Sequence, residues 1–274
     1  MDEKEQSMLK EYQNYLLEML LEFDAFCKLH ELKYFLAGGS TLGAVRHGGF
    51  IPWDDDIDLA MLRADFERLE EVMAECGNEI GLYKYSPVIG QIVPDAPIGH
   101  LLYLPEGDYN PADAPKLDIH PIDGLPGAAW KRKVQRFFSI VHYMAVYRHP
   151  TKNKGKAAHL ISKLLVKTTS DKMFDRYAKI SRRMLMAHDS RRAKEVCSLF
   201  GLAGYSREVM KREILVPYKN MVFEGHPLPV PNQTEVYLEQ LYGEYQTLPK
   251  EQERKPKHDG YVRFMNAMRD VKGE

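Results

Sequence analysis

The sequence predicts an α+β protein in which helices flank a mixed β-sheet and a basic helical lobe is attached. Three observations support this prediction. Apolar residues recur at helical spacing over residues 5–30, short strand-like runs follow, and a helical pattern rich in Lys and Arg occupies residues 128–200. We therefore expect a core at 1–127, the basic helical lobe at 128–200, and a C-terminal region at 201–274 that packs back on the core.

The composition is that of a folded protein, and it excludes several classes. Hydrophobic residues make up 44% of the 274 residues and charged residues 28%, so the chain is not intrinsically disordered. No apolar run reaches the ~18–20 residues of a membrane span, and the acidic, polar N-terminus differs from a secretory signal. The three cysteines form no CxxC pair, which argues against a cysteine zinc site and suits a reducing compartment. We expect a cytoplasmic protein.

The first elements alternate between helix and strand. Helical spacing predicts a helix over residues 5–30, and KYFLAG (Lys33–Gly38) predicts a short buried strand. Ser40 or Thr41 is placed to cap a short helix, which a Gly-Gly pair at 48–49 stops. The chain is thus expected to turn sharply from strand to helix at adjacent glycines.

Strand periodicity returns after this helix. DIDLAML (Asp56–Leu62) alternates charged and apolar residues, and a helix with an apolar face begins near Asp65. The segment 86–127 is rich in Pro and Gly and leaves no room for long helices. Further short strands are predicted around Ile80–Tyr85, Val88–Val93, His100–Leu104 and Lys116–Ile119.

Charge is distributed unevenly along the chain. The net charge is −1, yet residues 131–194 contain 18 Lys and Arg against three Asp, a balance of +15 that leaves −16 for the rest. This segment predicts an anion-facing surface; the alternative is a solvated helical lobe with scattered lysines. In its first helix, six positions are spaced for one buried face: Val134, Phe137, Phe138, Val141, His142 and Ala145.

Aspartates two positions apart indicate a metal site. On a strand, the side chains of Asp56 and Asp58 point to the same face, and two like charges so close are costly without a cation. Carboxylate oxygens suit Mg²⁺, which completes its shell with water and substrate phosphate. Asp54 has the same parity and is a third candidate ligand, whereas Asp55 is expected to point elsewhere in a continuous strand.

The turn at Gly38, Gly39 and Ser40 is suited to binding a phosphate. Glycines allow the backbone to approach a phosphate closely, and the N–H groups that open the next helix, around Ser40 and Thr41, carry a partial positive charge. In chain order, a strand, this turn, a short helix and the paired aspartates place a phosphate cradle beside a metal site.

Arg46 and His47 end the short helix. Arg46 can clamp a phosphate with two hydrogen bonds, and His47 can bond a phosphate or shuttle a proton; alternatively, both only complement the helix C-terminus. Trp53 is expected to pack beside the aspartates, although a tryptophan face can also hold a quaternary ammonium. His100 and His120 are expected to be ordinary strand histidines.

Other interpretations of the aspartates fit the sequence less well. A calcium loop that starts at Asp54 lacks its required residues, because its sixth position is Leu59 and its twelfth is Asp65. An exposed acidic loop is disfavoured, because Ile57 and Leu59 interleave the carboxylates as in a half-buried strand. Metal-dependent glycosyltransferases also use Asp-x-Asp, usually without a preceding Gly-Gly-Ser turn and helix.

These motifs resemble a known family. GGSTLGAVRHGGFIPWDDDIDLAM (Gly38–Met61) resembles the signature of the LicD family, whose relatives include fukutin-related proteins within the nucleotidyltransferase-fold superfamily. The resemblance extends to KLDIHPIDG (Lys116–Gly124) and VPNQTEVYLEQLYGEYQTLP (Val230–Pro249). It implies a nucleotidyltransferase-like mixed sheet flanked by helices.

The superfamily pattern has a Gly-Gly/Ser pair, two carboxylates on one strand and a third on a later strand. By resemblance, the first two parts fall on the glycine turn and on Asp56 and Asp58, which with Asp118 form the expected catalytic set. Asp123 is an alternative third carboxylate, but its place before Gly124 is more typical of a turn.

The resemblance implies a metal-dependent transferase that moves a phosphorylated alcohol from a CDP-linked donor to a sugar hydroxyl and releases CMP. Phosphocholine from CDP-choline is the expected group, and a teichoic acid, lipopolysaccharide or capsule precursor is the expected acceptor; fukutin relatives move ribitol phosphate. Two Mg²⁺ or Mn²⁺ ions are the superfamily expectation. Asp118 is either a ligand of the second ion or the general base.

The basic stretch 131–194 then has a candidate partner. It can hold an anionic or lipid-linked glycan acceptor, or contact acidic lipid peripherally at the inner face of the membrane. Nucleic acid is disfavoured, because no RNA-binding motif accompanies the lysines. Two alternative functions are a nucleotidyltransferase that uses a nucleoside triphosphate on another acceptor, and a non-catalytic nucleotide-binding module.

Overall fold

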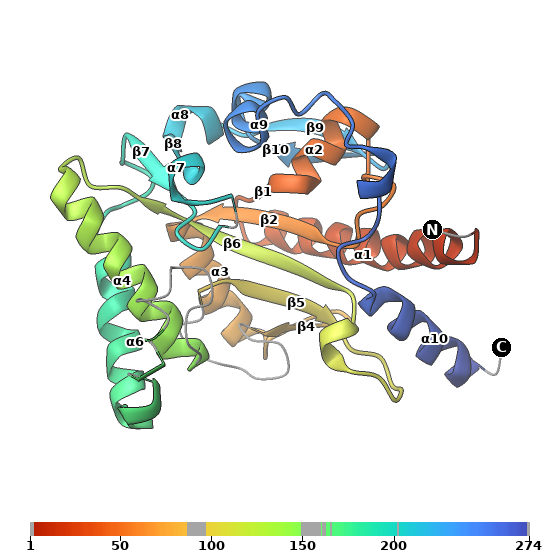
Figure 1. Ribbon diagram of the computed structural model, residues 1–274, viewed down its shortest axis with the longest axis horizontal. Helices are drawn as coiled ribbons and strands as arrows, with labels where there is room; N and C mark the ends of the chain where they lie inside the picture. The colour runs from red at the N-terminus through yellow and green to blue at the C-terminus, as the bar shows by residue number, and fades with distance from the viewer. Residues whose placement is uncertain are drawn as a thin grey trace.

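The computed structural model shows a mixed α/β molecule in which helices flank a central sheet, as the sequence predicts (Figure 1). The sheet contains both parallel and antiparallel pairs. None of the helices in the described part of the chain is both long and apolar enough to cross a membrane. The structure describes residues 3–86, 97–148, 160, 163, 164, 166–201 and 203–272.

The central pair of strands, β2 and β6, is parallel, and their other neighbours are antiparallel. In spatial order the main path is β1 (Phe35–Leu36), β2 (Ile57–Leu62), β6 (Lys116–Gly124), β5 (Gly99–Tyr103), β4 (Tyr83–Ser86) and β3 (Glu79–Ile80). β7 (Glu195–Cys197) extends the sheet from the end of β6, and β8 (Val209–Lys211) pairs with β7. The strand predicted at Val88–Val93 lies outside the described residues.

The helices come from every part of the chain and surround the sheet. Those described are α1 (Glu3–Leu29), α2 (Gly38–His47), α3 (Arg63–Glu75), α4 (Ala129–Tyr147), α6 (Asp171–Leu185), α7 (Tyr205–Glu208), α8 (Arg212–Leu215), α9 (Thr234–Tyr242) and α10 (Gly260–Lys272), with short 3₁₀ helices η1 (Pro111–Asp113) and η2 (Glu251–Glu253). A separate hairpin is formed by β9 (Lys219–Phe223) and β10 (His226–Val230).

The alternation of side chains along β2 divides the core in two. Ile57 and Leu59 are fully buried in a cluster with side chains of α1, α3 and α10. Ala60 and Leu62 belong to a second cluster with α2, α8 and α9. Because successive strand residues point to opposite faces, Asp58 lies on the face of this second cluster.

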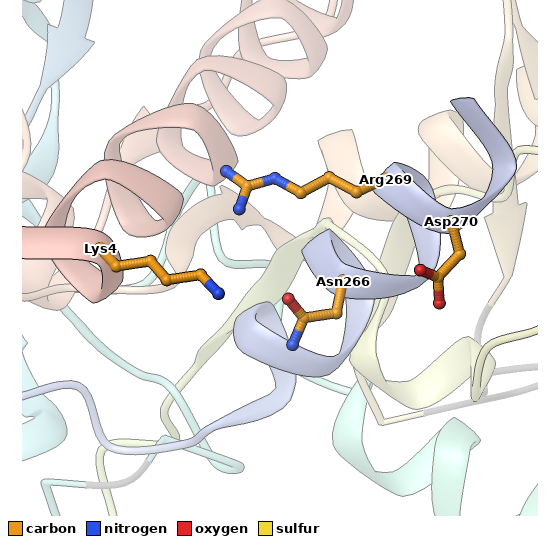
Figure 2. Close-up of a pocket in the computed structure, with 4 residues that line it drawn as sticks. All are labelled: Lys4, Asn266, Arg269 and Asp270. Carbon is orange, nitrogen blue, oxygen red and sulfur yellow. The ribbon is translucent and has the colours of Figure 1, made fainter. Parts of the chain in front are cut away.

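The C-terminal region contacts the N-terminal helix. α10 packs against α1, and the Arg269 guanidinium lies 3.5 Å from the Glu11 carboxylate. A hollow beside these helices is lined by Lys4, Asn266, Arg269 and Asp270 (Figure 2). None of the aspartates of the predicted site lines this hollow.

The segment 128–200 is less uniformly helical than predicted. α4 and α6 lie side by side at the end of the sheet where β6 leads into α4 (Figure 1). The chain then returns to the sheet as β7, which pairs with Asp123 and Gly124. This pairing satisfies the backbone hydrogen bonds at the end of β6.

The buried face of α4 was predicted only in part. His142 and Ala145 are buried as expected, but Val134 and Phe137 are 37% and 60% exposed. Polar contacts decide the orientation of the helix instead. The buried Gln135 amide donates to the carbonyl oxygens of Gly124 and Leu185 at 2.9 and 3.2 Å, and His142 bonds the Ser181 hydroxyl of α6 at 3.0 Å. These bonds satisfy the Gln135 amide nitrogen, while its oxygen Oε1 is buried without a hydrogen-bond partner.

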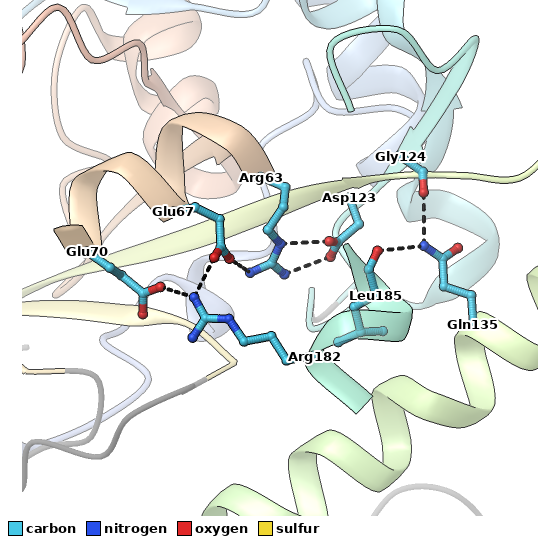
Figure 3. Close-up of polar contacts among 8 residues, drawn as sticks. All are labelled: Arg63, Glu67, Glu70, Asp123, Gly124, Gln135, Arg182 and Leu185. Carbon is cyan, nitrogen blue, oxygen red and sulfur yellow. Dashed lines mark hydrogen bonds and ion pairs between the residues drawn. The ribbon is translucent and has the colours of Figure 1, made fainter. Parts of the chain in front are cut away.

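Asp123 is a structural anchor and not the turn residue that the sequence predicts, because β6 continues to Gly124. Arg63 donates two hydrogen bonds to its carboxylate, from Nε at 2.7 Å and from Nη2 at 2.9 Å. Both side chains are buried, and Arg63 also approaches Glu67, which Arg182 of α6 contacts at 2.6 Å (Figure 3). The network joins α3, β6 and α6.

We predict that Asp123→Ala lowers the free energy of unfolding by about 3–5 kcal/mol, because Arg63 stays buried without its partner. Denaturant titration of the purified variant measures this loss. Glu71→Ala is the matched control: it removes an exposed partner of Arg68, and we expect a change below about 1 kcal/mol. A loss at Asp123 no larger than that at Glu71 would contradict the assignment.

Candidate active site

The parallel register of β2 and β6 sets Asp58 opposite Asp118. Paired residues of neighbouring strands point to the same face and lie on strands about 4.8 Å apart. His120, two residues after Asp118, points to this face as well, and His100 of β5 is the antiparallel partner of Asp118. Two carboxylates and two imidazoles therefore meet on one face of the sheet.

Asp118 is held by two cationic or hydrogen-bonding neighbours. His100 Nδ1 lies 2.6 Å from one carboxylate oxygen, and Lys116 Nζ donates to the other. Burial by itself raises the pKa of Asp118, but the hydrogen bond from His100 and the charge of Lys116 outweigh it and hold the pKa well below its usual value. Asp118 is therefore ionised at neutral pH.

Asp58 is fixed through both its backbone and its side chain. Its backbone N–H donates to Ser40 Oγ at 2.9 Å, and one carboxylate oxygen lies 3.2 Å from His120 Nε2. Burial lowers the pKa of His120, but the bond to Asp58 raises it more, so the net shift is upward. His120 Nδ1 is buried without a hydrogen-bond partner. His100 and His120 thus contact the predicted carboxylates. The sequence alone did not predict these contacts.

The alternation of the strand orients fewer of the aspartates than expected. β2 begins at Ile57, so Asp54, Asp55 and Asp56 precede the strand and its parity does not orient them. Asp54 and Asp56 nevertheless lie in the same charge cluster. Burial, together with the charge of Asp56, raises the pKa of Asp54 to about 8, and burial with the charge of Asp58 raises the pKa of Asp56. Burial thus makes the charged forms of Asp54 and Asp56 costly unless a cation approaches them.

The glycine turn lies against these carboxylates. Gly38 has a φ of +50°, and its N–H donates to the Tyr237 hydroxyl at 2.9 Å. A Cβ on Gly39 would lie 3.1 Å from a carboxylate oxygen of Asp54, and one on Gly38 would lie 3.5 Å from Asp58. The contact at Gly39 is tighter than a side chain normally allows, and Gly38 has a left-handed φ that favours glycine. The partial positive charge of the α2 N-terminus favours anions there.

The cap predicted at Ser40 or Thr41 is wrong. α2 begins earlier, at Gly38, and its N-cap Ala37 makes no side-chain bond. The Thr41 hydroxyl donates to the Leu36 carbonyl, while Ser40 accepts from β2. Both hydroxyls tie the helix to the sheet and are therefore not available as caps. The predicted stop is confirmed, because Gly48 ends the helix with a left-handed φ of 68°.

Arg46 and His47 lie at the other end of α2, about 12 Å along the helix axis from Gly38. Arg46 donates to the Tyr245 carbonyl and to His47 Nε2, each at 3.1 Å. Burial and the charge of Arg46 lower the pKa of His47, which is therefore neutral at pH 7. Their roles as phosphate ligands stay predictions.

A segment far away in the sequence contributes basic groups to the site. The stretch between α9 and α10 brings Lys257 Nζ to 3.7 Å from Asp56 and His258 Nδ1 to 3.7 Å from Asp55. The guanidinium of Arg254 lies 5.8 Å from the centre of the Trp53 ring, so this ring face already has a cationic neighbour. No local pattern identifies these residues, because about 200 positions separate them from the aspartates.

The donor set fits a divalent ion that is shared with a phosphate. Within the described residues, no group of three His, Cys, Asp or Glu side chains converges closely enough to hold a metal ion by itself. Mg²⁺ does not require such a cage, because it is usually held by one or two carboxylates, water and substrate phosphates. Asp56 and Asp58 supply two hard oxygen donors, and burial, together with the charge of Asp58, raises the pKa of Asp56.

Comparisons with known proteins agree with the motifs. Residues 31–87 match the model of the LicD/FKTN/FKRP nucleotidyltransferase domain. The chain is 28% identical over 262 residues to the lipopolysaccharide cholinephosphotransferase LicD of Haemophilus influenzae, an alignment that covers 91% of this chain and 96% of that protein. It is also 46% identical over 50 residues to the human ribitol 5-phosphate transferase FKRP, covering 18% of this chain and 10% of FKRP. The chain is thus similar to LicD-family proteins, and these similarities support a phosphotransferase enzyme.

Proposed function

We propose that this enzyme transfers phosphocholine from CDP-choline to a sugar hydroxyl of a cell-surface glycan precursor, such as a teichoic acid, lipopolysaccharide or capsule intermediate, and releases CMP. The observation that carries the proposal is the Asp58–Asp118 pair beside the N-terminus of α2. The similarity to a cholinephosphotransferase over almost the whole chain supports the choice of donor. We place the reaction in the cytoplasm, where CDP-linked donors are made.

The reaction joins the acceptor oxygen to the phosphorus that carries the alcohol and breaks the bond from this phosphorus to the oxygen that leaves with CMP. We propose that the partial positive charge at the start of α2 attracts the diphosphate, since the N–H groups of Gly38, Ser40 and Thr41 already have partners within the chain. Asp56 and Asp58 would hold Mg²⁺ or Mn²⁺, which supplies positive charge to the diphosphate oxygens. Lys257, beside Asp56, adds positive charge at the edge of the same site.

The surroundings of Asp118 favour one of its two expected roles. Both carboxylate oxygens already accept hydrogen bonds, from His100 and Lys116, and its pKa is lowered. A carboxylate with a lowered pKa is a weak base. We therefore propose that Asp118 provides charge, as a ligand of a second ion, and does not remove the acceptor proton.

We predict that CDP-choline binds in the presence of Mg²⁺ and that Asp58→Asn weakens this binding at least about tenfold, because one donor oxygen and one charge are lost. Calorimetry with a panel of CDP-alcohols, CTP and ATP measures the preference. Asp108→Asn, at an exposed aspartate outside the site, is the control and should bind like the wild type. Equal affinity for CDP-choline and for the triphosphates would overturn the choice of donor and favour a nucleotidyltransferase.

A second prediction concerns Lys257. Lys257→Met should weaken CDP-choline binding about two- to fivefold, as expected for the loss of an exposed charge. It should not weaken the binding of Mg²⁺ without nucleotide, because the variant removes a cation that competes with Mg²⁺ for Asp56. Lys255→Met alters an exposed lysine of the same segment and serves as the control. Equal effects of the two variants on donor affinity argue against a specific role for Lys257.

A further inference from the structure

The exposed surfaces of α4 and α6 are unusually apolar. On α4, Trp130 and Phe137 are 65% and 60% exposed. On α6, four further large apolar side chains are between 37% and 45% exposed: Met173, Tyr177, Ile180 and Met184. Contiguous apolar surface is costly in water and typically marks an interaction site.

Three parallel stripes run along α6. The buried stripe consists of Phe174, Ala178, Ser181 and Leu185 and packs towards α4 and the core. Each exposed apolar residue of α6 directly precedes a residue of the buried stripe in the sequence. Each is itself preceded by an exposed cationic residue, and these form the cationic stripe: Lys172, Arg176, Lys179 and Arg183. Because all three have the spacing i, i+4, i+7, i+11, each forms a continuous line along the helix.

The cations of this stripe are not used inside the fold. None of the ion pairs found among the described residues involves Lys172, Arg176, Lys179 or Arg183. On α4, Lys131 and Lys133 are exposed beside Trp130 and Val134. Apolar and cationic side chains are therefore presented together on both helices.

We propose that α4 and α6 form a docking surface for an anionic membrane. Helices with adjacent apolar and cationic stripes lie in the interface of such a membrane, where acyl chains receive the apolar residues and acidic headgroups receive Lys and Arg. Residues 131–194 carry a balance of +15, which complements a negative surface. The proposal goes beyond the transfer reaction and does not depend on the identity of the donor.

Two other occupants fit the surface less well. A second copy of the chain would bring the same positive charge against itself, which disfavours a symmetric dimer through this face. A nucleic acid would match the charge and could stack on Trp130, Phe137 or Tyr177, but it offers no apolar partner to Met173, Ile180 and Met184. An anionic bilayer is the partner that offers acyl chains to the apolar stripe and acidic headgroups to the cationic stripe.

The position of the surface suits an acceptor that is anchored in lipid. β2 and β6 begin on the side where the C-terminal segment approaches the aspartates and end towards α4 (Figure 1). Arg182 of α6 bonds Glu67 and Glu70 of α3 (Figure 3). The docking helices are thus fixed to the sheet that carries the site, so that membrane contact would also orient the site.

Sedimentation of the purified chain with vesicles, without nucleotide, tests the proposal. We expect binding to vesicles of phosphatidylcholine with phosphatidylglycerol, little binding to phosphatidylcholine alone, and weaker binding at high salt. The double variant Phe137→Ser/Ile180→Ser should bind about tenfold or more weakly. Lys179→Gln/Arg183→Gln should lose about fivefold for each charge removed. Leu82→Ser, at an apolar residue that is 78% exposed elsewhere, should bind like the wild type.

Several results would overturn the proposal. These are no binding to anionic vesicles, an unchanged affinity in Phe137→Ser/Ile180→Ser, or a dimer in analytical ultracentrifugation that this double variant converts to monomer. Tighter binding to RNA than to anionic vesicles, lost in the same variants, would also overturn it. Donor binding by each variant, measured separately, verifies folding, so a failure of the membrane proposal is distinguishable from a failure of the proposed reaction.

Discussion

The register between β2 and β6 is the constraint on which the site depends. It sets Asp58 opposite Asp118 on one face of the sheet, with the apolar partners Ile57 and Leu59 directed into the main core. A shift of β2 by one residue would turn Asp58 into the main core and remove Ile57 and Leu59 from it, which the cost of burying a carboxylate and the loss of apolar packing disfavour. The burial of the core therefore also fixes the geometry of the acidic site.

Given this register, the protein must stabilise several carboxylates in a small volume. It does so with groups from different parts of the chain: His100 and Lys116 at Asp118, His120 at Asp58, and Lys257 at Asp56. The N-terminus of α2 adds its partial charge. Burial, together with the charge of Asp56, raises the pKa of Asp54, and a further cation with its phosphate would favour the ionised carboxylates of the site.

The helices beyond the sheet are oriented by polar contacts. Gln135 holds α4 against Gly124 and Leu185, and Arg182 attaches α6 to α3, where Arg63 and Asp123 are buried together. These contacts rotate α4 so that apolar side chains face outward. The orientation of α4 that allows Gln135 to make its hydrogen bonds thus also exposes the apolar and cationic side chains of this helix.

The sequence alone determined the fold class, most strands and helices, the LicD-type motifs and the candidate aspartates, because periodicity and closely spaced motifs are local properties. It also indicated the uneven charge. Only the tertiary structure decided that Asp123 is paired with Arg63, that strand histidines contact Asp58 and Asp118, that Lys257 reaches Asp56, and that Phe137 faces outward. The physical reason is that each of these depends on a partner distant in the chain, whose position is set by packing and by the hydrogen bonds of buried polar groups.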